Sequence, residues 1–157
     1  MSETTINESA ATISAHSKAR TAQLAPIVLS MVRIVVSFLW ICHGLQGFFG
    51  LFGGVDGHGG VYTPSSGASF WASVIEVVVG AIVLVGLATR PAAVLCSGVM
   101  AFAYFTVHAR IGLFPIQNMG EESALYSWVF LLIAVLGPGR FAIDTLIRRR
   151  KASRVNS

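Results

Sequence analysis

The stretch PIVLSMVRIVVSFLWICHGLQGFFGLF at residues 26–52 decides the fold class of this chain. A helix of about 20 apolar residues crosses a hydrocarbon core roughly 30 Å thick, and this run is long enough to do so. Three further apolar runs follow at residues 69–87, 91–109 and 123–136. Because 54% of the 157 residues are hydrophobic and only 11% are charged, we predict an all-α integral membrane protein built as a four-helix bundle.

The composition limits what such a protein can contact. Its mean hydropathy is +0.72, and it holds 16 glycines, a residue that lets membrane helices approach closely. A formal charge of +4 would also fit nucleic-acid binding, but most basic residues lie just past the last apolar run. Six of the eleven are Arg140, Arg148, Arg149, Arg150, Lys151 and Arg154. We therefore expect contact with membrane lipid and none with nucleic acid.

The positive charges also predict the topology and the division of the chain. Lys18, Arg20, Arg90 and the C-terminal basic cluster fall on one side of the membrane, against only Arg110 in the other loops. Since cytoplasmic loops are enriched in Lys and Arg, both termini are expected in the cytoplasm. The chain then divides into a disordered tail at 1–24, a membrane domain at 25–148 and a basic tail at 149–157.

The fourth run ends at Gly137-Pro138-Gly139, where a straight helix is not expected to continue. Proline lacks an amide hydrogen and glycine lacks side-chain restraint, so a bend is predicted. Beyond the bend, apolar residues alternate with basic ones, as in a short amphipathic helix lying at the membrane surface. A basic end that stops membrane insertion is the simpler interpretation, and specific recognition of the membrane surface is the alternative.

Two motifs resemble those of the DoxX family of small bacterial membrane proteins. The first consists of IEV at 75–77, Gly80, LVGLATR at 84–90 and the pair Ala92-Ala93. The second is GPGRFAID at 137–144, preceded by ESALY at 122–126. The resemblance covers roughly residues 32–149, and the GPGRFAID ending is its most specific part.

The resemblance also assigns structural roles to single positions. These are Gly80, Arg90, Gly137, Pro138, Gly139, Arg140 and Asp144. HGLQG at residues 43–47 is similar to the family's first-helix motif, which usually has a lysine where this chain has Gly47. Chemistry that depends on such a lysine is therefore not expected here.

What the resemblance implies is a multi-pass, four-helix protein of the bacterial inner membrane, related to quinone-linked or respiratory oxidoreductase systems. That group includes a small subunit of a thiosulfate:quinone oxidoreductase and components of oxidative-stress complexes. The implied partner is a membrane redox or respiratory complex, and the implied cofactor is a quinone. The resemblance does not name a reaction, because one fold supports many activities.

Depth in the membrane brings several polar residues to one level. At about 1.5 Å per residue, His43 lies roughly 13 Å and Glu76 roughly 10 Å from the outer face. Tyr104, His108 and Tyr126 fall in the same half of their runs. Because an ionised carboxylate is costly in hydrocarbon, Glu76 is expected to face the interior with His43 as its partner.

The cluster of His43, Glu76, Tyr104, His108 and Tyr126 has two interpretations. It can bind a quinone head group or relay protons, with Glu76 and a histidine exchanging protons and a tyrosine donating a hydrogen bond. It can also hold the helices together through buried hydrogen bonds, and the residues alone slightly favour this role. Nothing in the histidine spacing is specific for haem, and no metal site is predicted.

Three functions stay open at this level. The leading one is a non-catalytic accessory subunit that docks onto a respiratory or redox complex. The second is a quinone-interacting oxidoreductase subunit that uses the Glu76 cluster. The third is a small-solute carrier, although the broken helices and inverted repeat typical of carriers are not evident. The partner, the substrate and the oligomeric state are not determined by the sequence.

Overall fold

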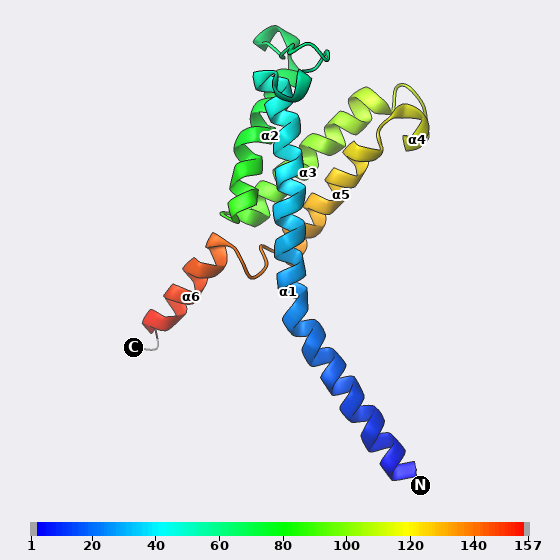
Figure 1. Cartoon of the computed structure of the whole chain (residues 1–157), viewed down its shortest axis with the longest axis vertical. Helices are drawn as coiled ribbons and strands as arrows, with labels where there is room; N and C mark the ends of the chain where they lie inside the picture. Colours follow the sequence, from blue (N-terminus) through cyan, green and yellow to red (C-terminus); the bar gives the residue numbers. More distant parts are fainter. Residues whose placement is uncertain (1–2, 156–157) are drawn as a thin grey trace.

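A computed structural model describes residues 3–155, and the regular elements in that range are all helical. Figure 1 shows the longest helix running through the molecule, with other helices packed along its C-terminal half. The helices are α1 (Glu3–Phe49), α2 (Ala68–Val85), α3 (Thr89–Ala103), α4 (Pro115–Asn118), α5 (Glu121–Leu136) and α6 (Ile143–Val155). Short turns are the 3₁₀ turns η1 (Leu51–Gly53) and η2 (Pro64–Ser66) and the π-helical turn η3 (Tyr104–His108).

Three helical stretches are long and apolar enough to cross a membrane: Thr12–Phe49, Ala68–Val85 and Thr89–His108. The prediction of an all-α membrane protein is confirmed, and the last three apolar runs begin and end within two residues of the predicted limits. The fourth run is α5, whose 16 residues extend about 24 Å. It is therefore shorter than a hydrocarbon core of roughly 30 Å.

The core lies where α1 packs against α2 and α3 packs against α5, with α2 and α3 also in contact. Trp40 of α1, Val83 of α2 and Phe130 of α5 are fully buried there. Ala93 and Cys96 are the fully buried residues of α3 that meet them, and their small size allows close approach. The outer faces carry many exposed large apolar side chains, as expected of helices surrounded by lipid.

The N-terminal part of α1 leaves the other helices. Every side chain from Thr12 to Ala25 is exposed, and Figure 1 shows this part extending away from the rest of the molecule. Helical geometry suits its alanine-rich sequence. The disordered tail expected at residues 1–24 stays a prediction, and residues 1 and 2 lie outside the described range.

The GPGRFAID segment makes the predicted bend and ties the helices together at the end of the molecule that carries both chain termini, here called the terminal end. Gly137 and Gly139 adopt φ values of 98° and 77°, which favour glycine. The Asp144 carboxylate accepts hydrogen bonds from the backbone N–H groups of Ala88 and Thr89, each 2.8 Å long. A residue at the start of α6 thus satisfies the unpaired donors at the start of α3.

Arg33 of α1 joins the same assembly, a role that was not predicted. Its side chain is fully buried, and its guanidinium group donates hydrogen bonds to four backbone carbonyls. These acceptors belong to Val83, Leu84, Pro138 and Phe141. Arg33 therefore connects α1 to the last turn of α2 and to the GPGRFAID segment. A lone arginine inside an apolar run is the signal that could have identified it.

Candidate functional site

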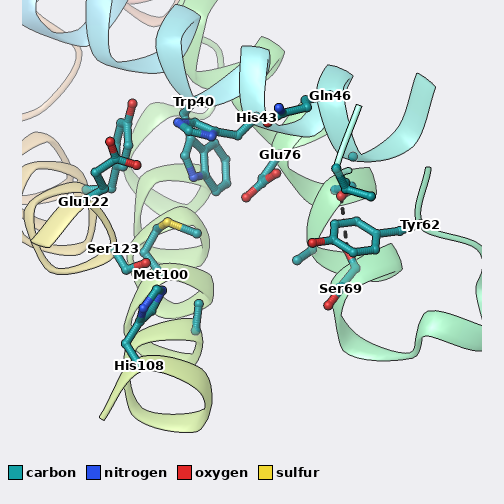
Figure 2. Close-up of a pocket in the computed structure, with 16 residues that line it drawn as sticks. Trp40, His43, Gln46, Tyr62, Ser69, Glu76, Met100, His108, Glu122 and Ser123 are labelled. Carbon is teal, nitrogen blue, oxygen red and sulfur yellow. Dashed lines mark hydrogen bonds between the residues drawn. The ribbon is translucent and has the colours of Figure 1, made fainter. Parts of the chain in front are cut away.

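A cavity of about 350 Å³ lies among α1, α2, α3 and α5, at the end of the helices opposite the terminal end. Figure 2 shows its lining, to which the loop after α1 contributes Tyr62. Four of the five residues predicted from their depth line it: His43, Glu76, His108 and Tyr126. The volume falls at the lower end of the range of about 300–1,000 Å³ typical of small-molecule sites.

Close approach of α1 and α2 places Glu76 in the cavity wall. Glu76 is 8% exposed, and a Cβ atom added at Gly44 would lie 2.7 Å from the Glu76 Cβ. A Cβ atom at Gly47 would lie 2.2 Å from the Ser73 Oγ. The two helices can meet at this distance only where α1 has no side chain, so Gly47, found in place of a lysine, serves packing here.

The carboxyl group of Glu76 forms no hydrogen bond within residues 3–155. Figure 2 shows it pointing into the cavity. The Glu76 carboxyl group is therefore available to a molecule in the cavity.

Trp40 supplies a second polar group without a partner. Its side chain is fully buried and lines the cavity, and its indole Nε1 has no acceptor among the described residues. Edge-to-face packing on Phe130, with ring centroids 4.9 Å apart, holds the indole in place. Buried tryptophan N–H groups usually find an acceptor, so this one is unusual, but it has almost no accessible surface toward the cavity. Trp40 was not predicted, although it stands three residues before His43 on the same face of α1.

His43 does not pair with Glu76, so that prediction was wrong. Its ring lies edge-to-face against Tyr126, with centroids 5.9 Å apart, and no hydrogen bond joins it to the carboxyl group in the described chain. Gly44, the next residue, is the one that faces Glu76. Because successive helical residues point about 100° apart, His43 faces α5 when Gly44 faces α2.

His108 lines the cavity, whereas Tyr104 does not. The His108 Nδ1 lies 2.9 Å from the carbonyl oxygen of Asn118, so Nδ1 carries a proton and Nε2 is left to exchange one. Both residues belong to η3, which is closed by a 2.8 Å hydrogen bond from the N–H of Ala109 to the carbonyl of Tyr104. Such a turn holds one more residue than an α-helical turn. Tyr104 and His108 both lie beside Gly120, so the two side chains stay close together although only His108 lines the cavity.

The loop that borders the cavity is held in place by its own hydrogen bonds. The Asp56 carboxylate accepts bonds of 2.8 Å from the backbone N–H groups of His58 and Gly60, and these bonds lower the pKa of Asp56. The backbone N–H of Tyr62 donates to the carbonyl of Gly47 at 2.7 Å, which attaches the loop to α1. Within the described residues, no group of three His, Cys, Asp or Glu side chains gathers as a metal site.

Comparison with known families agrees with this architecture. The DoxX family matches residues 28–109, just over half of the chain, and the match includes His43, Glu76 and His108. The chain belongs to the DoxX family. In this DoxX protein the GPGRFAID segment lies beyond the matched residues.

Two curated proteins are similar to this DoxX protein. An "Uncharacterized protein" of Haemophilus influenzae is 40% identical over 123 residues, which cover 76% of this chain and 90% of that protein. A Bacillus subtilis protein named "Putative oxidoreductase CatD" is 28% identical over 121 residues, which cover 77% of this chain and 87% of that protein. No solved structure matches the chain.

Proposed function

We propose that this DoxX protein is a small membrane subunit of a quinone-linked oxidoreductase system and that its cavity receives the quinone head group. One observation carries the proposal. The cavity lies among apolar helices, and the Glu76 carboxyl in its wall has no hydrogen-bond partner among the described residues. A pocket between helices that offers convergent polar groups is a usual place for a small molecule to bind.

The lining offers a quinone both polar and apolar contacts. The Tyr126 hydroxyl can donate a hydrogen bond to a ring carbonyl oxygen. Met100 and Ala103 of α3 provide apolar surface for the ring faces.

The residues of this chain would transfer protons to the quinone, whereas they would not supply its electrons. When bound, a quinone supplies a ring that takes up two electrons and two protons to form the quinol. Glu76 would pass a proton to a ring oxygen and regain it through His43 or the Nε2 of His108. The electrons would come from a partner redox protein, and the oxidoreductase name of the B. subtilis relative supports a redox setting.

The protein would act as an accessory subunit in this function, because a chain that supplies the quinone site needs a partner to supply electrons. It also includes a four-helix arrangement in the bacterial inner membrane, with α5 as the fourth crossing and both termini in the cytoplasm. The basic C-terminal residues support this topology. So does the position of both chain ends on the same side of the helices in Figure 1.

Tryptophan fluorescence can test the quinone site directly. The chain has three tryptophans, and Trp71 and Trp128 are 61% and 72% exposed, whereas Trp40 lines the cavity. A Trp71→Phe/Trp128→Phe background therefore leaves one reporter at the site. In nanodiscs, a short-chain ubiquinone or menaquinone analogue is expected to quench it saturably. Glu76→Leu, which removes a hydrogen-bonding group, is expected to weaken binding about tenfold.

Glu121→Leu is the matched control, because it removes an exposed carboxyl group outside the cavity lining. It is expected to leave the affinity unchanged. Quenching that does not saturate, or that is equal in the two variants, would exclude the quinone site. Purification from native membranes in mild detergent tests the second part: oxidoreductase subunits are expected to co-purify, and a protein that emerges alone would contradict the accessory role.

A further inference from the structure

We propose that the terminal end carries a binding site for an anionic phospholipid, formed by four arginines around a groove between α1, the GPGRFAID segment and α6. The groove has a volume of about 470 Å³. Arg90, Arg140, Arg148 and Arg149 line it, and no acidic residue does. This site is separate from the cavity near Glu76 and does not depend on the quinone proposal.

The positive charge of the groove is only partly neutralised by a neighbouring carboxylate. Asp144 is the acid nearest in sequence, but it lies outside the lining, and its oxygens accept hydrogen bonds from the start of α3. The Asp144 carboxylate attracts Arg148. Neither Arg140 nor Arg149 forms an ion pair within the described chain. The groove therefore presents a concentrated positive field to an anion.

The backbone beneath the arginines is held in a defined position. The N–H of Arg140 donates to the carbonyl of Pro26 at 2.9 Å, and the Thr145 hydroxyl donates to the carbonyl of Gly139 at 2.8 Å. The Nη1 of Arg90 donates to two carbonyls in the last turn of α5, at 3.1 and 2.9 Å. This leaves the Nε and Nη2 of Arg90 for an anion. A site with a fixed frame loses less entropy on binding than a flexible basic tail does.

The groove also has an apolar side, which favours a lipid over a free anion. Leu29 of α1 and Leu136, the last residue of α5, line it together with Pro26. A phosphate ion would use only the arginines, whereas a phospholipid would place its phosphate on them and an acyl chain against the leucines. Guanidinium groups suit the phosphate because they can bind two of its oxygens at once.

The position of the groove matches the membrane surface. It lies where the apolar part of α1 and the end of α5 give way to the basic residues of α6. Figure 1 shows α6 and the N-terminal part of α1 diverging below this point. Basic pockets between helices at the cytoplasmic surface are typical binding sites for anionic head groups.

The test uses the full-length protein in mild detergent at 0.15 M salt, with lipid binding measured by native mass spectrometry. The probes are phosphatidylglycerol, phosphatidylcholine with the same acyl chains, and glycerol phosphate. Phosphatidylglycerol is expected to bind, phosphatidylcholine to bind much more weakly, and glycerol phosphate not to displace the lipid. Displacement by glycerol phosphate at concentrations similar to the lipid would indicate a free-anion site and overturn the assignment.

Two double variants that remove the same charge distinguish binding in the groove from non-specific electrostatic attraction to α6. Arg140→Gln/Arg149→Gln is expected to weaken phosphatidylglycerol binding roughly thirtyfold. Arg150→Gln/Lys151→Gln removes the same charge from α6 outside the groove and is expected to change binding less than about threefold, because salt screens distant charges. Equal losses in the two variants would overturn the proposal. If the first variant unfolds, exposed Arg149→Gln alone is compared with Lys151→Gln by the same criterion.

Discussion

At the residue scale, the cavity exists because small and large side chains alternate along one face of α1. Trp40 fills the core, and Gly44 then lets α2 come close enough to place Glu76 in the cavity wall. At the opposite end, the charged guanidinium group of Arg33 lies in the protein interior, where it donates hydrogen bonds to backbone carbonyls. Buried polar residues in this chain therefore have two uses: Arg33 satisfies its donors internally, whereas Glu76 leaves its oxygens to the cavity.

Replacing Gly44 with alanine is expected to lower the free energy of unfolding by about 1–3 kcal/mol. The new Cβ would lie 2.7 Å from the Glu76 Cβ and 2.9 Å from the carbonyl oxygen of Ser73, so α1 and α2 would have to separate. Gly98→Ala in α3 is the matched control, because nothing lies within 4 Å of its added Cβ. Thermal unfolding in detergent is the measurement. Equal unfolding temperatures for the two variants would contradict the close α1–α2 contact.

At the element scale, a residue at the start of α6 supplies the hydrogen-bond acceptor for the free N–H groups at the start of α3. The Asp144 carboxylate therefore joins two helices that are more than fifty residues apart in the sequence. Asp144 also receives a 2.9 Å hydrogen bond from the hydroxyl of Thr89. The bend at Gly137-Pro138-Gly139 is what brings Asp144 back to this position.

Asp144→Asn is expected to destabilise the protein by about 1 kcal/mol near neutral pH, because both carboxylate oxygens accept hydrogen bonds and the amide replaces one of them with an NH2 donor. Partial burial raises the pKa of Asp144, but hydrogen bonds from Thr89 and Ala88 and the charge of Arg148 outweigh it, so the pKa is lowered. The stabilisation is therefore complete above the unfolded-state pKa of about 3.9 and is lost as the pH falls from there through the lower folded-state pKa.

The free energies of unfolding of the wild type and of Asp144→Asn, measured at pH 7 and pH 3, check this expectation. The gap between them should narrow at pH 3, because Asp144 then takes up a proton in the unfolded wild type, which favours unfolding. A gap that stays the same at both pH values would mean that the Asp144 charge does not support the cap.

At the scale of the whole molecule, the number of crossings decides on which side of the membrane the basic end lies. Three stretches meet the length and hydropathy of a membrane span, and α5 is shorter. With α5 as a fourth crossing, both termini share one side. Without it, the basic C-terminal residues and the N-terminus would face opposite sides, and the groove between α1 and α6 could not form.

Cysteine labelling distinguishes the two topologies. Cys42 and Cys96, the only cysteines in the sequence, would first be replaced with alanine. Single cysteines at His58, in the loop beside the cavity, and at Ser153, in α6, would then be treated with a membrane-impermeant maleimide in spheroplasts. Labelling is expected at position 58 in intact cells and at position 153 only after lysis. Labelling of position 153 before lysis would show that α5 does not cross.

The sequence predicted the helices well. Apolar length located three of the helices to within two residues, and depth counting brought His43, Glu76, His108 and Tyr126 to one cavity. The depth of a residue says how far it lies from the membrane surface but not toward which neighbouring helix its side chain points. That is why the pairing of His43 with Glu76 was wrong.

The length, hydropathy and charge of the apolar runs, and the bend at GPGRFAID, follow from the sequence alone, because each depends on residues that are neighbours in the chain. The lack of hydrogen-bond partners at the Trp40 Nε1 and at the Glu76 carboxyl, and the carbonyl contacts of Arg33, were decided only by the tertiary structure. Each depends on which residues of other helices come within a few ångströms, and helix rotation and close glycine contacts set those distances.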